Sequence, residues 1–235
     1  MTAFLAATVG GACGSASTRA AAPKGDDPHP VGSDHGARSR DHEHAHHGFA
    51  DADAWAKVFD DPARDTWQHP DDVLSALELA PTMTVADVGA GTGYFAVRLA
   101  RAVPEGEVIA TDVEPDMVRF VNERARREQI PNLRAVRATP AASGLAARSV
   151  DRILVVHVWH HLADRVAYAR DLAAALRPGG KLFVVDFSLT ARRGPPMNMR
   201  LGPDAVVADL VAAGMVAKLS PVSLPDQYLV EAHRP

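Results

Sequence analysis

The chain has 235 residues, which suits one domain with an extension, and its 25 Lys and Arg against 29 Asp and Glu give a formal net charge of −4. So small a charge argues against nucleic acid as the partner. The single cysteine, Cys13, excludes an internal disulfide and any site that holds a metal through several thiolates. Hydrophobic residues make up 47% of the chain, so most of it can bury a core.

Residues 1–48 are rich in small, polar and charged residues, which predicts a tail that does not fold on its own. A short apolar run from Ala3 to Val9, followed by small residues and Cys13, resembles a bacterial lipoprotein signal. However, no basic residue precedes the run, and Gly10 stands where such signals usually carry Leu. Two locations therefore stay open: an envelope lipoprotein anchored to the membrane through lipidated Cys13, or a cytoplasmic protein with an unstructured extension.

More than half of the chain's 11 histidines lie in this tail. Neutral imidazoles at this density can capture Zn, Ni or Cu, but no fixed pair of spacings marks a built metal site. A metal-binding tail and a solvated linker rich in histidine both stay open, and no metal ligand is assigned. The histidines concerned are His29, His35, His42, His44, His46 and His47.

Residues 49–80 are predicted to form a helical lid. Aromatic residues recur at helical spacing between residues 51 and 68, and Pro62 divides this segment into two short helices. A further helix is expected to run from Pro70 to about Leu79, with acidic residues near its positive end. Helices placed directly before the first strand of a domain can cover a ligand at the strand ends.

Residues 81–235 alternate short apolar runs with amphipathic segments, a pattern typical of a parallel sheet with helices on both faces. Strands are expected at residues 84–88, 108–111, 133–136, 152–157, 181–187, 215–219 and 227–232. Helices are expected at residues 94–103, 115–128, 163–176 and 203–213, the last closed by Gly214.

The first of these strands runs into Asp87-Val88-Gly89-Ala90-Gly91-Thr92-Gly93 and then into a helix. The glycines allow a tight turn and a close approach of the backbone to a ligand. A dinucleotide-binding loop would carry glycine at the next position, where this chain has Tyr94. Asp87 would repel a pyrophosphate but attract an ammonium group. The loop therefore favours a nucleoside that carries an amino acid, and a dehydrogenase is the weaker reading.

The second expected strand ends near Asp112, nineteen residues after Gly93. A carboxylate at this strand end can accept hydrogen bonds from both hydroxyls of a ribose, and Val113 can pack on a purine ring. The spacing of Asp112 alone fits a dehydrogenase equally well. Its combination with Asp87 is what favours the amino-acid-bearing nucleoside.

Together with Asp151, Trp159-His160-His161-Leu162 and Leu176-Arg177-Pro178-Gly179-Gly180-Lys181, these motifs resemble class I S-adenosylmethionine-dependent methyltransferases, especially the ubiquinone/menaquinone-biosynthesis type. The resemblance implies a Rossmann-like, doubly wound α/β fold with seven strands, mostly parallel with an antiparallel last strand. It also implies S-adenosylmethionine as the cofactor and a small molecule as the methyl acceptor. The residues expected to contact the cofactor are Asp87, Gly89, Ala90, Gly91, Gly93, Asp112, Val113, Met117 and Thr139.

One departure from the family concerns the segment after the third strand. The family often carries Gly-Asp-Ala there, whereas this chain has Ala138-Thr139-Pro140. The hydroxyl of Thr139 could replace the Asp as an acceptor for the adenine amino group.

The acceptor side is expected at the ends of the fourth and fifth strands. The fourth strand is followed by His157-Val158-Trp159-His160-His161, so His157 or His160 could act as a base or an orienting group. Alternatively, His160 caps the next helix and His161 packs inside it. Asp186 ends the fifth strand, where it would either bind substrate or pair with Arg192 or Arg193. His157, His160 and Asp186 are the predicted catalytic residues.

A second class of function competes with the enzyme. The chain could be a non-catalytic envelope lipoprotein whose tail binds metal and whose domain binds a nucleoside without turnover. The sequence favours no particular acceptor atom and no oligomeric state.

Overall fold

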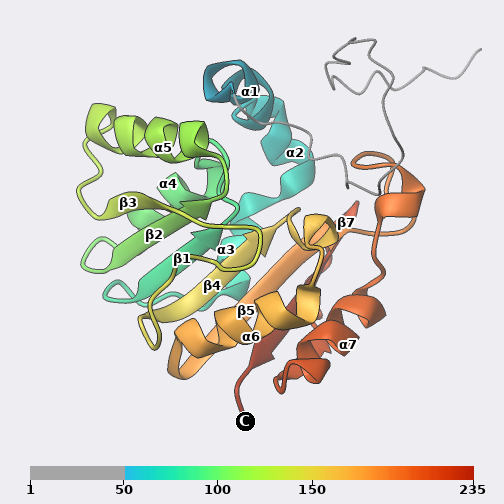
Figure 1. Cartoon of the computed structure of the whole chain (residues 1–235). Helices are drawn as coiled ribbons and strands as arrows, with labels where there is room; N and C mark the ends of the chain where they lie inside the picture. Colours follow the sequence, from blue (N-terminus) through green and yellow to red (C-terminus); the bar gives the residue numbers. More distant parts are fainter. Residues whose placement is uncertain (1–50) are drawn as a thin grey trace, which may run out of the picture. The chain divides into compact units, whose positions relative to one another are not determined.

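The computed structural model describes residues 51–235, so the predicted tail, Cys13 and the six tail histidines lie outside the described residues. The described chain forms a seven-stranded sheet in the order β3-β2-β1-β4-β5-β7-β6 (Figure 1). The strands are β1 (Thr84–Val88), β2 (Glu107–Asp112), β3 (Leu133–Arg137), β4 (Val150–Val156), β5 (Leu176–Phe187), β6 (Val216–Leu219) and β7 (Gln227–His233).

The order and direction of the strands give the doubly wound fold that the sequence predicted. Strands β1 to β5 pair in parallel, and β7 runs antiparallel between β5 and β6. The last strand is therefore antiparallel, as expected. Because β1 and β4 lie at the centre, with successive strands added on opposite sides, the ends of β1 and β4 border the crevice where such folds bind ligands.

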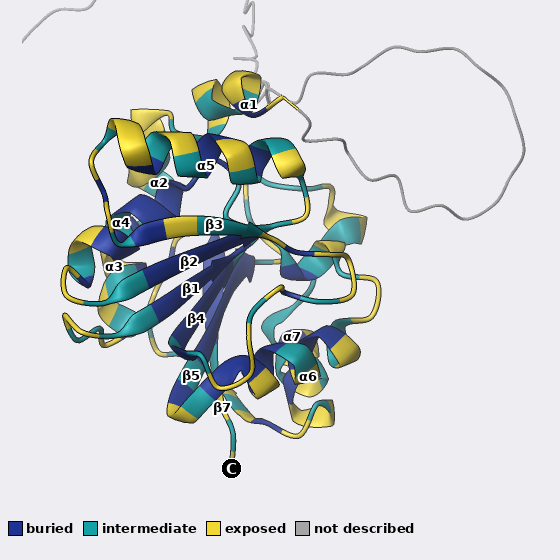
Figure 2. Cartoon of the chain, turned by 60° about the vertical axis from the view of Figure 1, so that its left-hand side comes forward, coloured by how far each residue is buried: buried dark blue, intermediate teal, exposed yellow. Residues whose placement is uncertain are grey.

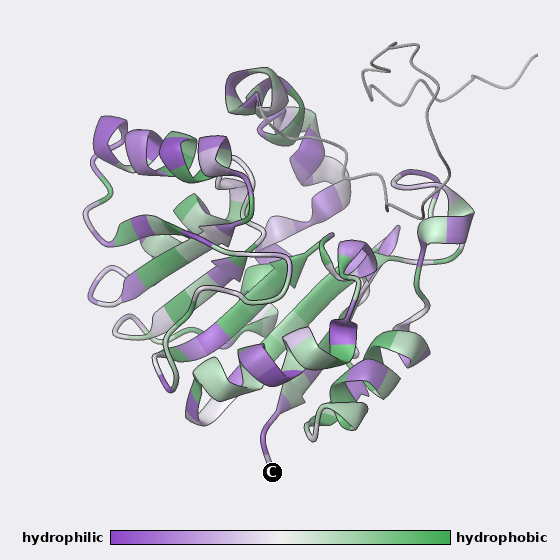
Figure 3. Cartoon of the chain, in the orientation of Figure 1, coloured by the Kyte–Doolittle hydropathy of each residue, from purple (hydrophilic) through white to green (hydrophobic). Residues whose placement is uncertain are grey.

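Helices cover both faces of the sheet. Helices α3, α4 and α5 bury one face, and α6 and α7 bury the other. In Figure 2 the inner strands β1, β2, β4 and β5 are mostly buried, whereas the edge strand β3 and the outer sides of the helices carry exposed residues; in Figure 3 the inner strands are mostly hydrophobic. The α-helices are α1 (Ala52–Phe59), α2 (Asp65–Gln68), α3 (Pro70–Ala76), α4 (Tyr94–Ala102), α5 (Pro115–Arg127), α6 (Arg165–Ala175) and α7 (Pro203–Ala212). Short 3-10 helices occupy Pro62–Arg64, Trp159–His161 and Met197–Met199.

The predicted end of α3 near Leu79 is three residues too late, since α3 ends at Ala76, and the predicted boundary between α6 and β5 is wrong. The sequence indicated a helix up to Leu176 and a strand from Lys181, but α6 ends at Ala175 and β5 already begins at Leu176. Pro178 disfavours helical backbone at the residue before it, and Gly179 adopts a left-handed φ of 78°. The segment Leu176–Gly180 therefore extends the sheet.

The segment before the sheet is helical where it is described. Helices α1 and α2 lie over the carboxyl ends of the strands, and α1 packs on α5 through Ala52, Met117 and Phe120 (Figure 1). Within residues 51–235 the structure contains no helix that is both long and apolar enough to cross a membrane.

Candidate functional site

The glycine loop after β1 is shaped for close approach. Gly89, Gly91 and Gly93 have φ values of 70°, 54° and 87°, a region that other residues rarely adopt. A Cβ on Gly89 would lie 2.3 Å from Cγ2 of Val158, and one on Gly91 would lie 3.4 Å from the ring of Phe59. The loop therefore forms a cradle between the strand ends and the lid. Side chains at the three glycine positions would strain this backbone or fill the cradle.

Asp87 lies at the base of this cradle and is 3% exposed. Its Oδ2 is buried and has no hydrogen-bond partner among the described residues. Burial raises the pKa of Asp87 to about 7, although the positive charge of Arg64 acts in the opposite direction. A buried carboxylate oxygen without a donor is costly, so the position fits a cationic donor such as the ammonium group of S-adenosylmethionine.

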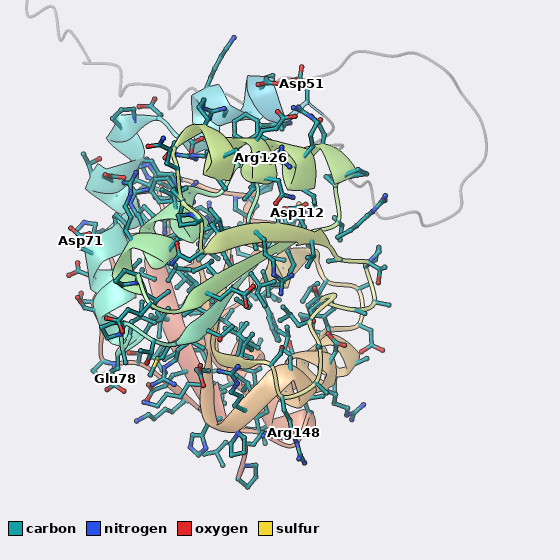
Figure 4. The ribbon with its side chains drawn as sticks, turned by 90° about the vertical axis from the view of Figure 1, so that its left-hand side faces the viewer. Asp51, Asp71, Glu78, Asp112, Arg126 and Arg148 are labelled. Atoms are coloured by element: carbon teal, nitrogen blue, oxygen red, sulfur yellow. The ribbon has the colours of Figure 1, made fainter. Side chains whose placement is uncertain are left out.

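Asp112, labelled in Figure 4, ends β2 and holds the loop in place. Its Oδ2 accepts a 2.9 Å hydrogen bond from the backbone N–H of Gly91, and its Oδ1 accepts a 2.9 Å hydrogen bond from the backbone N–H of Glu114. A carboxylate has about four acceptor positions, so Asp112 can also accept from ribose hydroxyls. Burial raises its pKa, which these two backbone donors partly oppose. Val113 beside it is 41% exposed and is able to lie against a purine.

Two other predicted cofactor residues have partners within the chain. Met117 is 1% exposed and packs against Ala52 of the lid. The hydroxyl oxygen of Thr139 accepts hydrogen bonds from Ala141 (3.3 Å) and Ala142 (3.0 Å). Since these bonds use both lone pairs, the hydroxyl of Thr139 is left to donate to an adenine ring nitrogen rather than to accept from its amino group. Both residues stay predictions as cofactor contacts.

His157 lies in a stack of aromatic rings at the end of β4. Its ring is 4.0 Å from that of Phe187 and 6.0 Å from that of Trp67 in the lid, both nearly parallel. Its Nε2 lies 2.9 Å from Oε1 of Gln227. The same Oε1 accepts a 2.7 Å hydrogen bond from Nε2 of Gln68. Since Oε1 can only accept, Nε2 of His157 carries the proton and Nδ1 keeps its lone pair.

Burial lowers the pKa of His157 to about 3, against the opposing charge of Asp186. The imidazole is therefore neutral at pH 7 and a weak base. In this arrangement His157 can orient an acceptor through Nδ1, and general base catalysis by His157 stays a prediction.

His160 and Asp186, both predicted to be catalytic, pair with each other. Their side chains are 3% and 2% exposed, and Nδ1 of His160 lies 2.9 Å from Oδ1 of Asp186. Burial raises the pKa of Asp186, but the hydrogen bond and charge of His160 outweigh burial and leave that pKa below its usual value. The backbone N–H of Phe187 also donates to Asp186 at 2.8 Å. The pair joins the 3-10 helix after β4 to the end of β5, where the sequence predicted the acceptor side; catalytic roles for His160 and Asp186 stay predictions.

Several alternatives for this region are wrong. Arg192 and Arg193 pair with Asp226, at 3.5 and 3.1 Å, and not with Asp186. The side chain of Asp164, rather than His160, caps α6 by accepting from Ala167. His161 is exposed and does not pack inside a helix.

Sequence reasoning missed the residues that join the lid to the domain. Gln68 and Gln227 are 0% and 5% exposed and hydrogen bond to each other, and Nε2 of Gln227 donates to the backbone oxygen of Trp67 at 3.1 Å. Arg64 lies against Tyr94, and Arg193 lies 4.9 Å from the ring of Trp67. The only signal in the sequence was their position: Arg64 and Gln68 lie in the predicted lid, Arg193 in the loop after β5, and Gln227 at the start of the last strand. Among residues 51–235, no group of three or more His, Cys, Asp or Glu side chains is arranged to hold a metal ion.

Comparison with known proteins connects this site to methyltransferases. Residues 85–180 match the methyltransferase domain family. The chain is 31% identical over 106 residues to the ubiquinone/menaquinone biosynthesis C-methyltransferase UbiE of Pasteurella multocida, covering 44% of this chain and 40% of that protein. It is 34% identical over 118 residues to an uncharacterized methyltransferase of Mycobacterium tuberculosis, covering 50% of this chain and 45% of that protein. The chain thus spans less than half the length of these curated relatives.

Solved structures extend the likeness beyond the matched domain. A SAM-dependent methyltransferase from Aquifex aeolicus is 27% identical with a TM-score of 0.71, covering 77% of this chain and 97% of that chain. A geranyl diphosphate C-methyltransferase from Streptomyces coelicolor, solved with S-adenosyl-L-homocysteine, has 16% identity and a TM-score of 0.62 over 76% of this chain and 83% of that chain. The second likeness concerns the fold alone.

Proposed function

Because residues 85–180 form a methyltransferase domain within a class I fold, we propose that this chain transfers a methyl group from S-adenosylmethionine to a small-molecule acceptor. The observation that carries the proposal is the glycine cradle with Asp87 beneath it, whose buried Oδ2 lacks a donor. A nucleotide phosphate would meet repulsion from this carboxylate, whereas an ammonium group would supply the missing hydrogen bond.

In this proposal the loop from Gly89 to Gly93 lies against the amino-acid end of the cofactor, and Asp87 accepts from its ammonium group. Asp112 accepts from the ribose hydroxyls, and Val113 packs on the adenine. When bound, S-adenosylmethionine supplies both the reactive methyl group and its own leaving group, so the chain need not form a covalent bond. The chain's part is to align the acceptor and to exclude water.

The acceptor side is proposed at the ends of β4 and β5. The rings of Trp67, His157 and Phe187 stack on one another and line this region with an aromatic wall, which favours a planar acceptor. The lone pair of Nδ1 on neutral His157 can accept a hydrogen bond from such a molecule. The buried pair of His160 and Asp186 fixes the two strand ends relative to each other and so acts by positioning.

Calorimetric titration of the full-length chain with S-adenosylhomocysteine tests the cofactor assignment, with NADH as the control ligand. We expect binding in the micromolar range for the first and none for the second. Binding of NADH alone would instead establish the dehydrogenase reading. Transfer of a labelled methyl group from S-adenosylmethionine to a panel of quinols and phenols then tests turnover. Nucleoside binding without transfer to any acceptor would favour the non-catalytic envelope protein.

Membrane attachment through Cys13 stays a prediction from the sequence alone. Mass spectrometry of the mature chain from its natural host would detect an acylated N-terminal Cys13 or an unprocessed N-terminus.

A further inference from the structure

Arg64 belongs to the lid, outside the matched methyltransferase domain, yet it lies beside the glycine loop. Its Cζ is 3.9 Å from the centre of the Tyr94 ring, and its Nη1 donates a 2.9 Å hydrogen bond to the backbone oxygen of Phe59. Tyr94 directly follows Gly93, and the Phe59 ring covers Gly91. The guanidinium group therefore lies next to the loop that is proposed to hold the amino-acid end of the cofactor.

Arg64 has donors that the chain does not use. Its Nε and Nη2 donate to Oε1 of Gln68 at 3.2 and 3.0 Å, and Nη1 donates to Phe59. A guanidinium group carries five N–H bonds, so two remain. Among residues 51–235, no carboxylate forms an ion pair with Arg64. Burial lowers its pKa only to about 10, so the group stays charged at neutral pH.

Asp87 supplies the opposite charge in the same region. The charge of Arg64 opposes the effect of burial on the pKa of Asp87, and the charges of Tyr94, Asp60 and Asp87, in that order, oppose the effect of burial on the pKa of Arg64. Each side chain is thus influenced by the charge of the other, while Oδ2 of Asp87 has no hydrogen-bond partner among residues 51–235. A cation and an anion held apart in one site match a zwitterion, whose ammonium and carboxylate groups are also held apart.

We propose that Arg64 binds the carboxylate of the cofactor's amino-acid group, while Asp87 faces its ammonium group. This assignment rests on the proposed function, since it requires the glycine cradle to hold S-adenosylmethionine. It also gives the lid a part in cofactor binding: a carboxylate bound by Arg64 holds Phe59 and Gln68 over the site, because Arg64 is hydrogen bonded to both.

Arg98 provides a matched control within the same structure. Its Cζ also lies 3.9 Å from the centre of the Tyr94 ring, so the ring lies between the two guanidinium groups. However, Nη2 of Arg98 already pairs with both oxygens of Asp65, at 2.8 and 3.0 Å. Its charge is therefore satisfied inside the chain, and we assign it no part in binding the cofactor.

The test compares three nucleosides by calorimetric titration of the full-length chain. They are S-adenosylhomocysteine, its decarboxylated analogue, which keeps the amine, and 5′-methylthioadenosine, which lacks the amino-acid group. We expect the wild type to bind S-adenosylhomocysteine about 10–100-fold more tightly than the decarboxylated analogue, because hydrogen bonds to a charged group are strong. Arg64→Met should lose this preference and bind 5′-methylthioadenosine as the wild type does. Arg98→Met should keep the preference.

Equal affinity of the wild type for S-adenosylhomocysteine and its decarboxylated analogue overturns the assignment without any variant. A preserved preference in Arg64→Met overturns it as well. Failure of the wild type to bind all three nucleosides refutes the proposed function itself. If Arg64→Met binds none of them, its fold is damaged, and Arg64→Gln, which is uncharged but still carries N–H donors, takes its place: loss of the preference supports the assignment, and a preserved preference overturns it.

Discussion

Replacing Gly89 by alanine tests whether contact with the end of β4 fixes the glycine loop. The new Cβ would lie 2.3 Å from Cγ2 of Val158, well inside van der Waals contact, and the residue would have to adopt a φ of 70°. The left-handed backbone costs an L-residue about 1–2 kcal/mol, and overpacking adds about 1–3 kcal/mol. Gly89→Ala should therefore lower the free energy of unfolding by about 2–5 kcal/mol, a large part of a typical domain's stability.

The matched control is Gly214→Ala. Gly214 has a φ of 88°, but a Cβ there would meet nothing within 4 Å. This variant should therefore lose only the backbone cost of about 1–2 kcal/mol. Urea denaturation of both variants measures the two costs separately, and Val158→Ala in the Gly89→Ala background should recover about 1–3 kcal/mol, because it removes the clash but not the strained φ.

The reasoning fails if Gly89→Ala is no more destabilised than Gly214→Ala, or if Val158→Ala does not rescue it. Binding supplies a second readout. S-adenosylhomocysteine should bind Gly89→Ala at least about 10-fold more weakly than the wild type, and Val158→Ala should not restore affinity, since the added methyl group still narrows the cradle. Full affinity in Gly89→Ala would mean that Gly89 does not approach the ligand.

Three further predictions concern the same site. Asp112→Ala should weaken S-adenosylhomocysteine binding by about 10–100-fold in calorimetry, since it removes the proposed ribose acceptor and an anchor of the loop; unchanged affinity contradicts the assignment. Asp87→Asn should stabilise the ligand-free chain at pH 8, because burial raises the pKa of Asp87 from 3.8 to about 7 and each unit costs about 1.4 kcal/mol. The stability that protonated Asp87 gives the wild type is complete below pH 3.8 and is lost as the pH rises through 7. The stability advantage of Asp87→Asn over the wild type, measured by urea denaturation, should therefore shrink toward pH 5. A difference in unfolding free energy that does not change with pH argues against the raised pKa of Asp87. Gln227→Leu removes the acceptor for Gln68 and should raise hydrogen exchange in residues 51–68, whereas unchanged protection shows that other contacts hold the lid.

Local sequence determined most of the fold and half of the site. The alternation of apolar runs and helical segments predicted each strand of the sheet, because burial on both faces of a parallel sheet requires that pattern. The glycines from Gly89 to Gly93 and the carboxylates Asp87 and Asp112 were predictable because a few neighbouring residues define the turn and the strand ends. The misplaced end of α6 shows the limit of local reasoning, since pairing with β4 draws Leu176 into the sheet.

Only the tertiary structure decided which polar groups satisfy one another. His160 and Asp186 were both expected at the acceptor side, but their mutual pairing depends on the alignment of β4 with β5. The contact between Gln68 and Gln227 joins residues 159 positions apart. No periodicity encodes such a pair, because burial requires each polar group to have a partner but does not say which one. Arg64 illustrates the same point: the sequence predicted helices before the sheet, while only the tertiary structure brought the guanidinium group of Arg64 against Tyr94, next to the glycine loop, and under the influence of Asp87.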